Sequence, residues 1–264
     1  MSRPLIPAQR RERIQEYLAI HKIAPSSELS ALLDVSEATI RRDLEWMENE
    51  GVLVRTHGGA ILNTRLQLEP EYTQRAQRNV EEKRQIGLLA ASLIKEGEIV
   101  FINSGTTTTQ VIRNIRSGAG ITVITNNVAA ALEINDPGFE IILLGGYFQS
   151  TSNSVVGRFA IENLGQIYAN QAFIGVDGIT SHHGYTVPSM AEAEVIRLMI
   201  ERTKGPVNIV SDYSKWGIVS NFEIAPIDRI QRLITDDRLG PTAIEALANR
   251  PIEVLVAGAH ILET

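Results

Sequence analysis

The chain has 264 residues, 44% of them hydrophobic, and a net charge of −6, values that indicate a folded protein with room for one large domain and one small one. It has no cysteine and five scattered histidines, which excludes disulfides and thiolate catalysis and leads us to expect no metal ion and no cofactor. No apolar run reaches the length of about 18 residues that a membrane-spanning helix needs, and no signal-peptide pattern opens the sequence, so we expect a soluble cytoplasmic protein.

The first part of the chain predicts three helices. A first helix covers 8–21, and after Pro25 a second, short helix begins, which Ser26 or Ser27 can cap. A tight corner then leads to a third helix, which Ser36 caps. The apolar residues that these helices carry at helical spacing are Ile14, Leu18, Leu29, Leu32, Leu33, Ile40, Leu44 and Met47.

The third helix is followed by a predicted β-hairpin over 52–62, with its turn at 57–59. Helix, helix, turn, helix and hairpin within about 60 residues is the order of a winged helix-turn-helix, whose third helix enters the DNA major groove by its N-terminal end. Residues 1–65 carry nine basic and nine acidic side chains, so the acidity of the chain belongs to the remainder, and the arginines here are clustered.

We expect DNA contacts from the N-terminal ends of the second and third helices and from the hairpin. Arg41 and Arg42 can reach a phosphate or the edge of a guanine. The full set of expected DNA-binding residues is Ser26, Ser27, Ser36, Glu37, Ala38, Thr39, Arg41, Arg42, Arg55 and His57. The alternative is a helical bundle that binds protein, with Asp43 paired internally and both arginines in solvent. Trp46 is expected in a core or an interface rather than stacked on DNA.

The small domain, 1–62, is followed by a predicted linker, 63–74, and by a large domain, 75–264. In the large domain, short β-branched runs alternate with helical stretches. This pattern is typical of an α/β fold with a largely parallel sheet covered on both faces. The expected strands cover residues 99–103, 121–125, 140–144, 172–176, 207–211, 232–236 and 252–256.

Polar loops follow directly on five of these strands. In an open parallel sheet, ligands bind beyond the carboxyl ends of the strands, so we expect the loops to form one pocket. The first loop turns at Ser104 and Gly105 into a helix whose N–H groups and threonine hydroxyls favour an anion. The expected effector-binding residues are Asn103, Ser104, Gly105, Thr106, Thr107, Thr108, Asn126, Gly145, Gly146, Asp177 and Lys215.

Each of these features also has a simpler structural explanation. The threonines can cap a helix, the glycines can serve only as turn residues, Asp177 can cap a helix and Lys215 can lie in solvent. Glu192 and Glu194 are expected to be charges at a helix N-terminus, stabilised by the helix dipole. Arg158 is open to either an ion pair or a phosphate contact. The pocket hypothesis therefore depends on the loops occurring together.

The sequence resembles the DeoR-type family of bacterial repressors over residues 8–256. In the three helices the matching residues are Arg10, Ile14, Leu18, Ser36, Thr39, Ile40, Arg41, Arg42, Asp43 and Leu44. In the large domain the matching blocks are residues 104–107, 125–127, 145–146, 175–178 and 212–215. The chain has Asn103 where many members of the family have an aspartate.

This resemblance implies a large domain similar to ribose-5-phosphate isomerase, which binds a phosphorylated sugar or sugar-derived effector. It implies a repressor of a carbohydrate-metabolism operon, acting as a homodimer or homotetramer, which the effector releases from double-stranded operator DNA. We expect no catalytic residues. The alternative is an isomerase-like enzyme with an appended helix-turn-helix, in which Asp177, Glu192 and Lys215 would serve as acid–base or stabilising groups.

Overall fold

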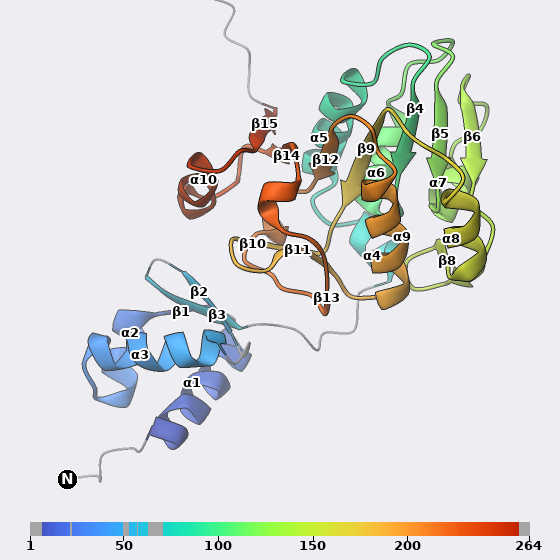
Figure 1. Cartoon of the computed structure of the whole chain (residues 1–264). Helices are drawn as coiled ribbons and strands as arrows, with labels where there is room; N and C mark the ends of the chain where they lie inside the picture. The colour runs from blue at the N-terminus through green and yellow to red at the C-terminus, as the bar shows by residue number, and fades with distance from the viewer. Residues whose placement is uncertain (1–6, 22, 50–52, 57, 63–70, 259–264) are drawn as a thin grey trace, which may run out of the picture. The chain divides into compact units, whose positions relative to one another are not determined.

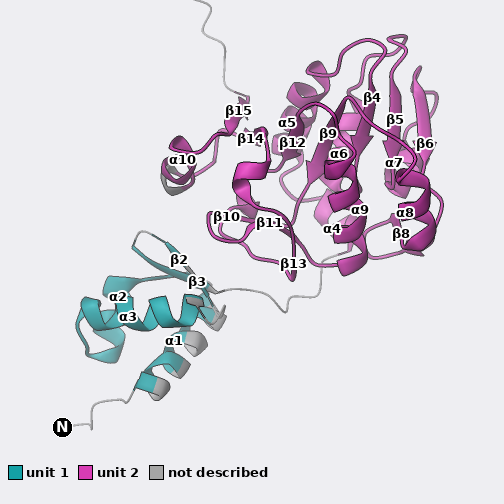
Figure 2. Cartoon of the chain, viewed as in Figure 1, with its two compact units in different colours: residues 1–66 teal, residues 67–264 magenta. Residues whose placement is uncertain are grey.

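The computed structural model describes residues 7–21, 23–49, 53–56, 58–62 and 71–258. The chain divides into two compact units, Met1–Leu66 and Gln67–Thr264, which we call the N-terminal unit and the C-terminal unit (Figure 2). In the part of the chain that the structure describes, no helix combines the length and the apolar character needed to cross a membrane.

The N-terminal unit packs helices against a small antiparallel sheet (Figure 1). Its described elements are α1 (Pro7–His21), β1 (Ile23–Pro25), α2 (Ser26–Leu33), α3 (Glu37–Asn49), β2 (Leu53–Thr56) and β3 (Gly59–Leu62). The predicted apolar spacing is confirmed for Ile14, Ile40 and Leu44, which are buried in one cluster with residues of the sheet. Leu32, listed with them, is instead 54% exposed. The predicted three helices and hairpin are present.

Two details of this unit differ from the sequence expectation. Ser26 and Ser27 do not cap α2: Pro25 is the N-cap and no side chain caps the helix, because Ser26 is already its first helical residue. Strand β1 was not predicted, since three residues are too few to show an alternating pattern. β1 pairs with β3, with Pro25 opposite Gly59, so the sheet order is β1-β3-β2.

Parallel strands form the central sheet of the C-terminal unit, in the order β15-β14-β12-β9-β4-β5-β6 (Figure 1). They are β4 (Ile99–Ile102), β5 (Thr122–Thr125), β6 (Glu140–Leu143), β9 (Gln171–Gly175), β12 (Val207–Val210), β14 (Arg232–Asp236) and β15 (Glu253–Ala257). Each predicted strand is confirmed, and no predicted end differs by more than one residue. The short β-branched runs identified them because strands covered on both faces are continuously apolar.

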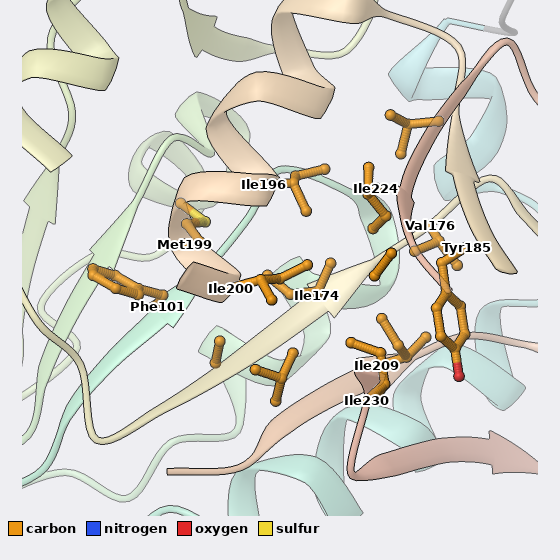
Figure 3. Packing of buried hydrophobic residues seen from close by; sticks show 14 of the residues in the cluster. Phe101, Ile174, Val176, Tyr185, Ile196, Met199, Ile200, Ile209, Ile224 and Ile230 are labelled. Carbon is orange, nitrogen blue, oxygen red and sulfur yellow. The ribbon is translucent and has the colours of Figure 1, made fainter. Parts of the chain in front are cut away.

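Helices cover both faces of this sheet, and alternate residues of β4 pack against different helices. Val100 lies in a buried cluster with Ile86 of α5 (Val80–Ser92) and with residues of α6 (Thr106–Arg113). Phe101 lies in the other cluster, with Met199 of α9 (Met190–Glu201) (Figure 3). The remaining described helices are α4 (Tyr72–Ala76), α7 (Val128–Glu133), α8 (Arg158–Leu164), α10 (Pro241–Ala248) and the short 3-10 helices η1 (Tyr213–Lys215) and η2 (Ile227–Arg229).

Several short strands outside the central sheet were not predicted. They are β7 (Tyr147–Gln149), β8 (Ser154–Val156), β10 (Gly178–Thr180), β11 (Gly184–Val187) and β13 (Phe222–Ala225). β7 and β8 form a hairpin, and β10, β11 and β13 form a second antiparallel sheet. Tyr185 of β11 packs in the same cluster as Ile209 and Ile230, so this second sheet extends the core of the unit (Figure 3).

Helix α4 begins inside the segment 63–74 that was predicted as a linker. Its first residue, Tyr72, is buried against the C-terminal unit, and its backbone N–H donates to the Thr151 carbonyl at 3.0 Å. The last residues of that segment therefore belong to the C-terminal unit rather than to a linker. Pro70 and the polar residues around it concealed the start of this five-residue helix from a pattern analysis.

Candidate functional site

The N-terminal end of α3 presents polar side chains in the position expected for contact with DNA. Ser36 caps α3 as predicted, because its hydroxyl accepts a hydrogen bond from the Thr39 N–H at 3.2 Å. Arg41 and Arg42 are both exposed, and Arg41 lies 3.3 Å from the carboxylate of Glu37. An ion pair this exposed contributes little stability, so Arg41 can exchange Glu37 for a phosphate at low cost.

The other expected DNA contacts lie in α2, α3 and the hairpin. The exposed members of the expected set are Ser27, Ser36, Glu37, Ala38, Arg41, Arg42 and Arg55. Ser26 is buried, Thr39 is half-buried, and His57 lies outside the described residues. Arg55 is positioned by its backbone N–H, which donates to the Glu48 carboxylate at 3.0 Å and so joins β2 to α3.

Asp43, on α3, is paired with two arginines of α1. The Nε of Arg10 contacts one carboxylate oxygen, and the Nε of Arg11 donates to the other at 3.2 Å. The Arg11 guanidinium also lies 3.9 Å from the ring centroid of Trp46. Trp46 is a surface side chain of the N-terminal unit, 45% exposed, so the core alternative is wrong and the interface alternative stays a prediction. Internal pairing of Asp43 was part of the alternative prediction, a helical bundle that binds protein. The pairing joins α1 to α3.

In the C-terminal unit, the loop between β4 and α6 makes the sharp turn that the sequence predicts. Gly105 has a φ of 152°, a backbone conformation that favours glycine, and it occupies the N-cap of α6 without a side-chain cap. The hydroxyls of Thr108 and Thr109 donate to the Gly105 carbonyl at 2.9 and 2.8 Å. Since the first N–H groups of a helix have no partner within it, the turn directs the N–H groups from Thr106 onward out of the helix end.

Asparagines after β4 and β5 fix this loop to its neighbours. The Asn103 amide donates to the Gly175 carbonyl at 3.0 Å and accepts from the Gly175 N–H at 2.7 Å. The Asn126 side chain accepts from the Ser104 N–H at 2.8 Å, and Asn127 donates to a hydroxyl of α6. The side chains of Asn103 and Asn126, both proposed from the sequence as effector ligands, are buried and shape the loop from within.

Asp177, directly after β9, lies between two cations from distant parts of the chain. Arg75 of α4 and Lys215 of η1 each approach the same carboxylate oxygen at 3.4 Å. The side chains are 19% exposed for Asp177, 12% for Arg75 and 25% for Lys215. Asp177 therefore caps no helix, and Lys215 is not a solvated surface lysine. The sequence analysis placed Asp177 and Lys215 at the site, and it missed Arg75.

Other residues near Arg75 were also missed by the sequence analysis. The Tyr72 hydroxyl lies 2.9 Å from the Thr109 hydroxyl, which in turn bonds to the turn before α6. The Lys83 ammonium donates to the backbone carbonyl of Arg75 at 2.6 Å, and burial lowers the pKa of Lys83 to about 8. Lys83 could have been found, because it occupies the buried face of α5 three residues before Ile86.

Glu192 lies beside this group, in the first turn of α9, as the sequence predicts, but it is buried. Its carboxylate accepts from the Ser154 hydroxyl at 3.1 Å. Burial raises the pKa of Glu192, the Asp177 carboxylate raises it further, and the hydroxyls of Ser152 and Ser154 oppose the shift. The burial of Glu192 could have been predicted, because it is a charged residue on an apolar helix face. Val195 and Ile196 are buried on the same side of α9.

The remaining candidates are Gly145, Gly146 and Arg158. A side chain at Gly146 would lie 2.6 Å from the Val156 carbonyl, so glycine is needed there for packing, whereas Gly145 is exposed and has room. Arg158 forms the expected ion pair, with Glu162 at 2.6 Å on the surface of α8, and its alternative role as a phosphate contact stays a prediction.

The loops after β4, β5, β9 and β12 are thus joined to one another by hydrogen bonds and ion pairs. Together with α4, which supplies Arg75, they bring the N-terminus of α6, two cations and a carboxylate to one edge of the sheet, where Ser104, Gly105 and Thr106 are half-buried. Such an edge suits an anion that also carries hydroxyl groups. Over the described ranges, no group of three or more histidines and acidic residues is placed to hold a metal ion.

Residues 10–66 match the family described as DeoR-like helix-turn-helix domain, and residues 78–237 match the family described as DeoR C terminal sensor domain. The chain is 36% identical over 244 residues to the HTH-type transcriptional repressor GlcR of Bacillus subtilis, which covers 92% of this chain and 93% of that protein. It is 33% identical over 251 residues to the HTH-type transcriptional regulator GlpR of Haloferax volcanii, with coverage of 95% and 98%. Among solved structures, ribose 5-phosphate isomerase A of Methanocaldococcus jannaschii has a TM-score of 0.37 and 14% identity, covering 52% of this chain and 55% of that one.

Proposed function

Because this chain belongs to the DeoR family of transcriptional regulators, we propose that it represses a carbohydrate-metabolism operon and that a phosphorylated sugar releases it from operator DNA. The proposed sensing function rests on the group of Asp177, Arg75 and Lys215, which we call the Asp177 cluster, together with the turn into α6. Phosphate oxygens accept hydrogen bonds from N–H groups at a helix N-terminus and pair with cations. We place the phosphate at residues 104–107 and the sugar hydroxyls toward Asp177.

The DNA-reading half is assigned to α3, whose exposed first turns carry Arg41 and Arg42. One such helix reads one half-site of the operator, so we propose a homodimer or homotetramer in which the α3 helices of two subunits contact spaced half-sites. We also propose that the protein acts in the cytoplasm. The sugar phosphate favours an arrangement of the readers that no longer matches that spacing. It can shift this equilibrium only by its difference in affinity for the two states.

We propose binding without turnover. An aldose–ketose isomerase needs a base that can take a proton from a carbon next to the carbonyl. In this chain the Asp177 carboxylate is shared by two cations, and the Glu192 carboxylate accepts a hydrogen bond from Ser154. Incubation of the protein with pentose and hexose phosphates, followed by product analysis, should detect no conversion at ordinary enzyme rates.

The DNA assignment is tested with a duplex that the full chain selects from a random library. We expect Arg42→Ala to abolish binding of this duplex and to leave sugar-phosphate binding intact, because Arg42 is an exposed residue of the N-terminal unit. Arg116→Ala, which removes an exposed arginine of the C-terminal unit, is the charge-matched control and should bind the duplex like the wild type. Loss of sugar-phosphate affinity in Arg42→Ala would contradict the division of labour between the units.

The sensing assignment is tested by a thermal-shift screen of phosphorylated and unphosphorylated sugars. A ligand that binds the native state raises the melting temperature, and the sugar that does so should also release the selected duplex. We expect the phosphorylated form of the active sugar alone to do both. Equal affinity of that sugar for free and duplex-bound protein would rule out the release mechanism.

A further inference from the structure

Strand β6 ends the central sheet on one side, and within the described structure it pairs with β5 alone. The Glu140 N–H donates at 3.1 Å to the carbonyl of Ile121, directly before β5. Because successive strand residues direct their backbone groups to opposite sides, the N–H and carbonyl groups of Ile141 and Leu143 point away from β5. Proteins usually protect such an open strand edge with charged residues or proline, and residues 141–144 contain neither.

Exposed apolar side chains surround this open strand. Ile142 and Leu143 are both exposed, although successive strand residues point to opposite faces of a sheet, so neither face of β6 is fully covered. Tyr147 and Phe148 of β7 and Phe159 of α8 are exposed as well. We call these five residues the β6 surface.

The elements that carry the β6 surface lie together in the C-terminal unit. Helix α7 packs on both β6 and β8, α8 packs on β8, and β8 pairs with β7. Tyr147 lies opposite Val156, and a side chain at Gly157 would lie 3.8 Å from the Tyr147 Cβ, so Tyr147 is next to the start of α8. Figure 1 shows β6, α7, α8 and β8 at the same side of this unit, so the five residues belong to one surface.

The charge of this region favours a second copy of the chain as its partner. Residues 141–157 contain no charged side chain, although 21% of the chain is charged. Nucleic acids and anionic membranes bind through clustered basic side chains, which residues 141–157 lack. The large domain carries the net negative charge of the chain, so two copies repel each other unless they meet at an uncharged surface.

The exposed aromatic area is a substantial part of what a stable dimer buries. Tyr147, Phe148 and Phe159 are 72%, 49% and 70% exposed, and an aromatic side chain buries about 150–250 Å² when it is fully covered. The three rings therefore present roughly 300–500 Å² per copy, and a stable interface buries about 800 Å² per partner. Ile142, Leu143 and the uncharged residues of β7 and β8 add further area.

We infer that the β6 surface is a subunit interface and that it is covered by the β6 surface of a second copy. This inference rests on the homo-oligomer proposed above. About a two-fold axis the two β6 strands run antiparallel, so their outward N–H and carbonyl groups pair with each other and the two central sheets join. The exposed aromatic rings of each copy then cover the apolar side chains of the other.

This interface adjoins the sensing site through the loop after β5. The Asn126 side chain accepts from the Ser104 N–H at 2.8 Å and donates to the Val155 carbonyl of β8 at 3.1 Å. The Val155 N–H donates in turn to the Asn126 carbonyl at 2.9 Å. A single side chain therefore connects the turn that we assign to the phosphate with the strand that pairs with β7 of the β6 surface.

The test measures the oligomeric state of the full chain by sedimentation velocity over a range of protein concentrations. Phe159→Glu places a carboxylate on the β6 surface of each copy, and Tyr147→Ser removes an exposed ring from β7. Ile244→Glu, at an exposed apolar position of α10, is the matched control. All three should keep the circular dichroism spectrum of the wild type, because each replaced side chain is exposed.

The two β6-surface variants should lose one assembly step, from dimer to monomer or from tetramer to dimer. Two-fold symmetry repeats each substitution, so Phe159→Glu should raise the dissociation constant of this step by about hundredfold or more. Tyr147→Ser should raise it by about tenfold or more, and Ile244→Glu should stay within about twofold of the wild type.

DNA binding supplies a second readout. Phe159→Glu should bind the selected duplex more weakly than the wild type but bind a single half-site equally well, because each α3 is intact and the two are no longer joined. An unchanged dissociation constant in both β6-surface variants would overturn the inference, leave the proposed function in place and assign the surface to a different partner. Equal dissociation of Ile244→Glu would also overturn it. A wild type that stays monomeric at every concentration and on the duplex would contradict the proposed homo-oligomer, and the inference with it.

Discussion

Each unit of this protein contains an aspartate paired with two cations, and the two clusters differ in tightness. Asp43 gives a separate oxygen to each of its arginines, and its side chain is 3% exposed. Asp177 gives one oxygen to both Arg75 and Lys215, at 3.4 Å, and its side chain is 19% exposed. Asp43 therefore has its charge fully matched away from water, whereas Asp177 shares a weaker interaction near solvent.

The difference indicates which cluster maintains the fold and which can exchange partners. A buried ion pair is costly to break, because removing one partner leaves an uncompensated charge inside the protein. A looser, more accessible pair is worth little to stability and can be rearranged by a competing charge. We therefore assign the Asp43 cluster to the rigidity of the DNA-reading unit and the Asp177 cluster to ligand exchange.

The largest effect expected is that of Asp43→Asn. It removes the Asp43 carboxylate from Arg10, which is 8% exposed, and should lower the free energy of unfolding of the N-terminal unit by about 3 kcal/mol. Trp46 reports this unit and Trp216 the other, so urea unfolding is followed by Trp46 fluorescence in a Trp216→Phe background. A loss below about 1 kcal/mol would remove the contrast between the two clusters.

A smaller change, visible as a pH dependence, is expected for Glu192→Gln beside Asp177. The pKa of Glu192 is raised above 4.5 by burial and by Asp177, so between 4.5 and its folded-state pKa the native state binds more protons than the unfolded state. Wild-type stability then falls as the pH rises through this window, and the variant lacks this fall. Urea unfolding at about pH 5 and about pH 8, read by Trp216 fluorescence in a Trp46→Phe background, should favour the variant more at the higher pH. Parallel pH profiles would contradict the burial of a charge here.

For Asp177→Asn we expect a decrease in the free energy of unfolding of less than about 1 kcal/mol, because the pair is loose and partly exposed. The measurement is again urea unfolding by Trp216 fluorescence, in parallel with Asp43→Asn. The matched substitution makes the two clusters directly comparable. A decrease as large as that of Asp43→Asn would show that Asp177 is structural and would weaken its assignment to ligand exchange.

A similarly small effect is expected at Trp46, whose ring contacts the second arginine of the Asp43 cluster. Trp46→Leu should lower the stability of the N-terminal unit by about 0.5–1 kcal/mol, the range of an exposed cation–π contact. Thermal unfolding followed by circular dichroism measures it, with Glu45→Ala, another exposed position on α3, as the control. No loss relative to this control would mean that Arg11 depends on Asp43 alone.

Much of the fold was accessible from the sequence because its signals are local. The strands of the central sheet are buried on both faces, so they appear as uninterrupted apolar runs, and the helices of the N-terminal unit show a regular apolar spacing. The hairpin of β7 and β8 and the second sheet were missed because strands of three or four residues give no usable alternation. The cap of α2 was predicted one or two residues too late, at Ser26 or Ser27 instead of Pro25.

The site was only partly predictable because its contacts join distant positions. Asp177 and Lys215 follow strands, so the topology of a parallel sheet locates them. Arg75 lies 102 positions before its partner Asp177, and its local sequence resembles a polar linker. Asn103 was expected at the ligand, but its amide matches both backbone groups of Gly175, a pairing that only the strand order β9-β4 creates.

The short strand β1 has a consequence for how DNA is read. A side chain at Gly59 would lie 2.0 Å from the Ala24 carbonyl, and the Ser26 N–H donates to the Gly58 carbonyl at 2.6 Å, so the hairpin is fastened to the start of α2. The hairpin and α3 therefore meet the duplex at one fixed separation. A duplex whose grooves do not have that spacing must deform to be bound, so recognition depends on the stiffness of the DNA as well as on its bases.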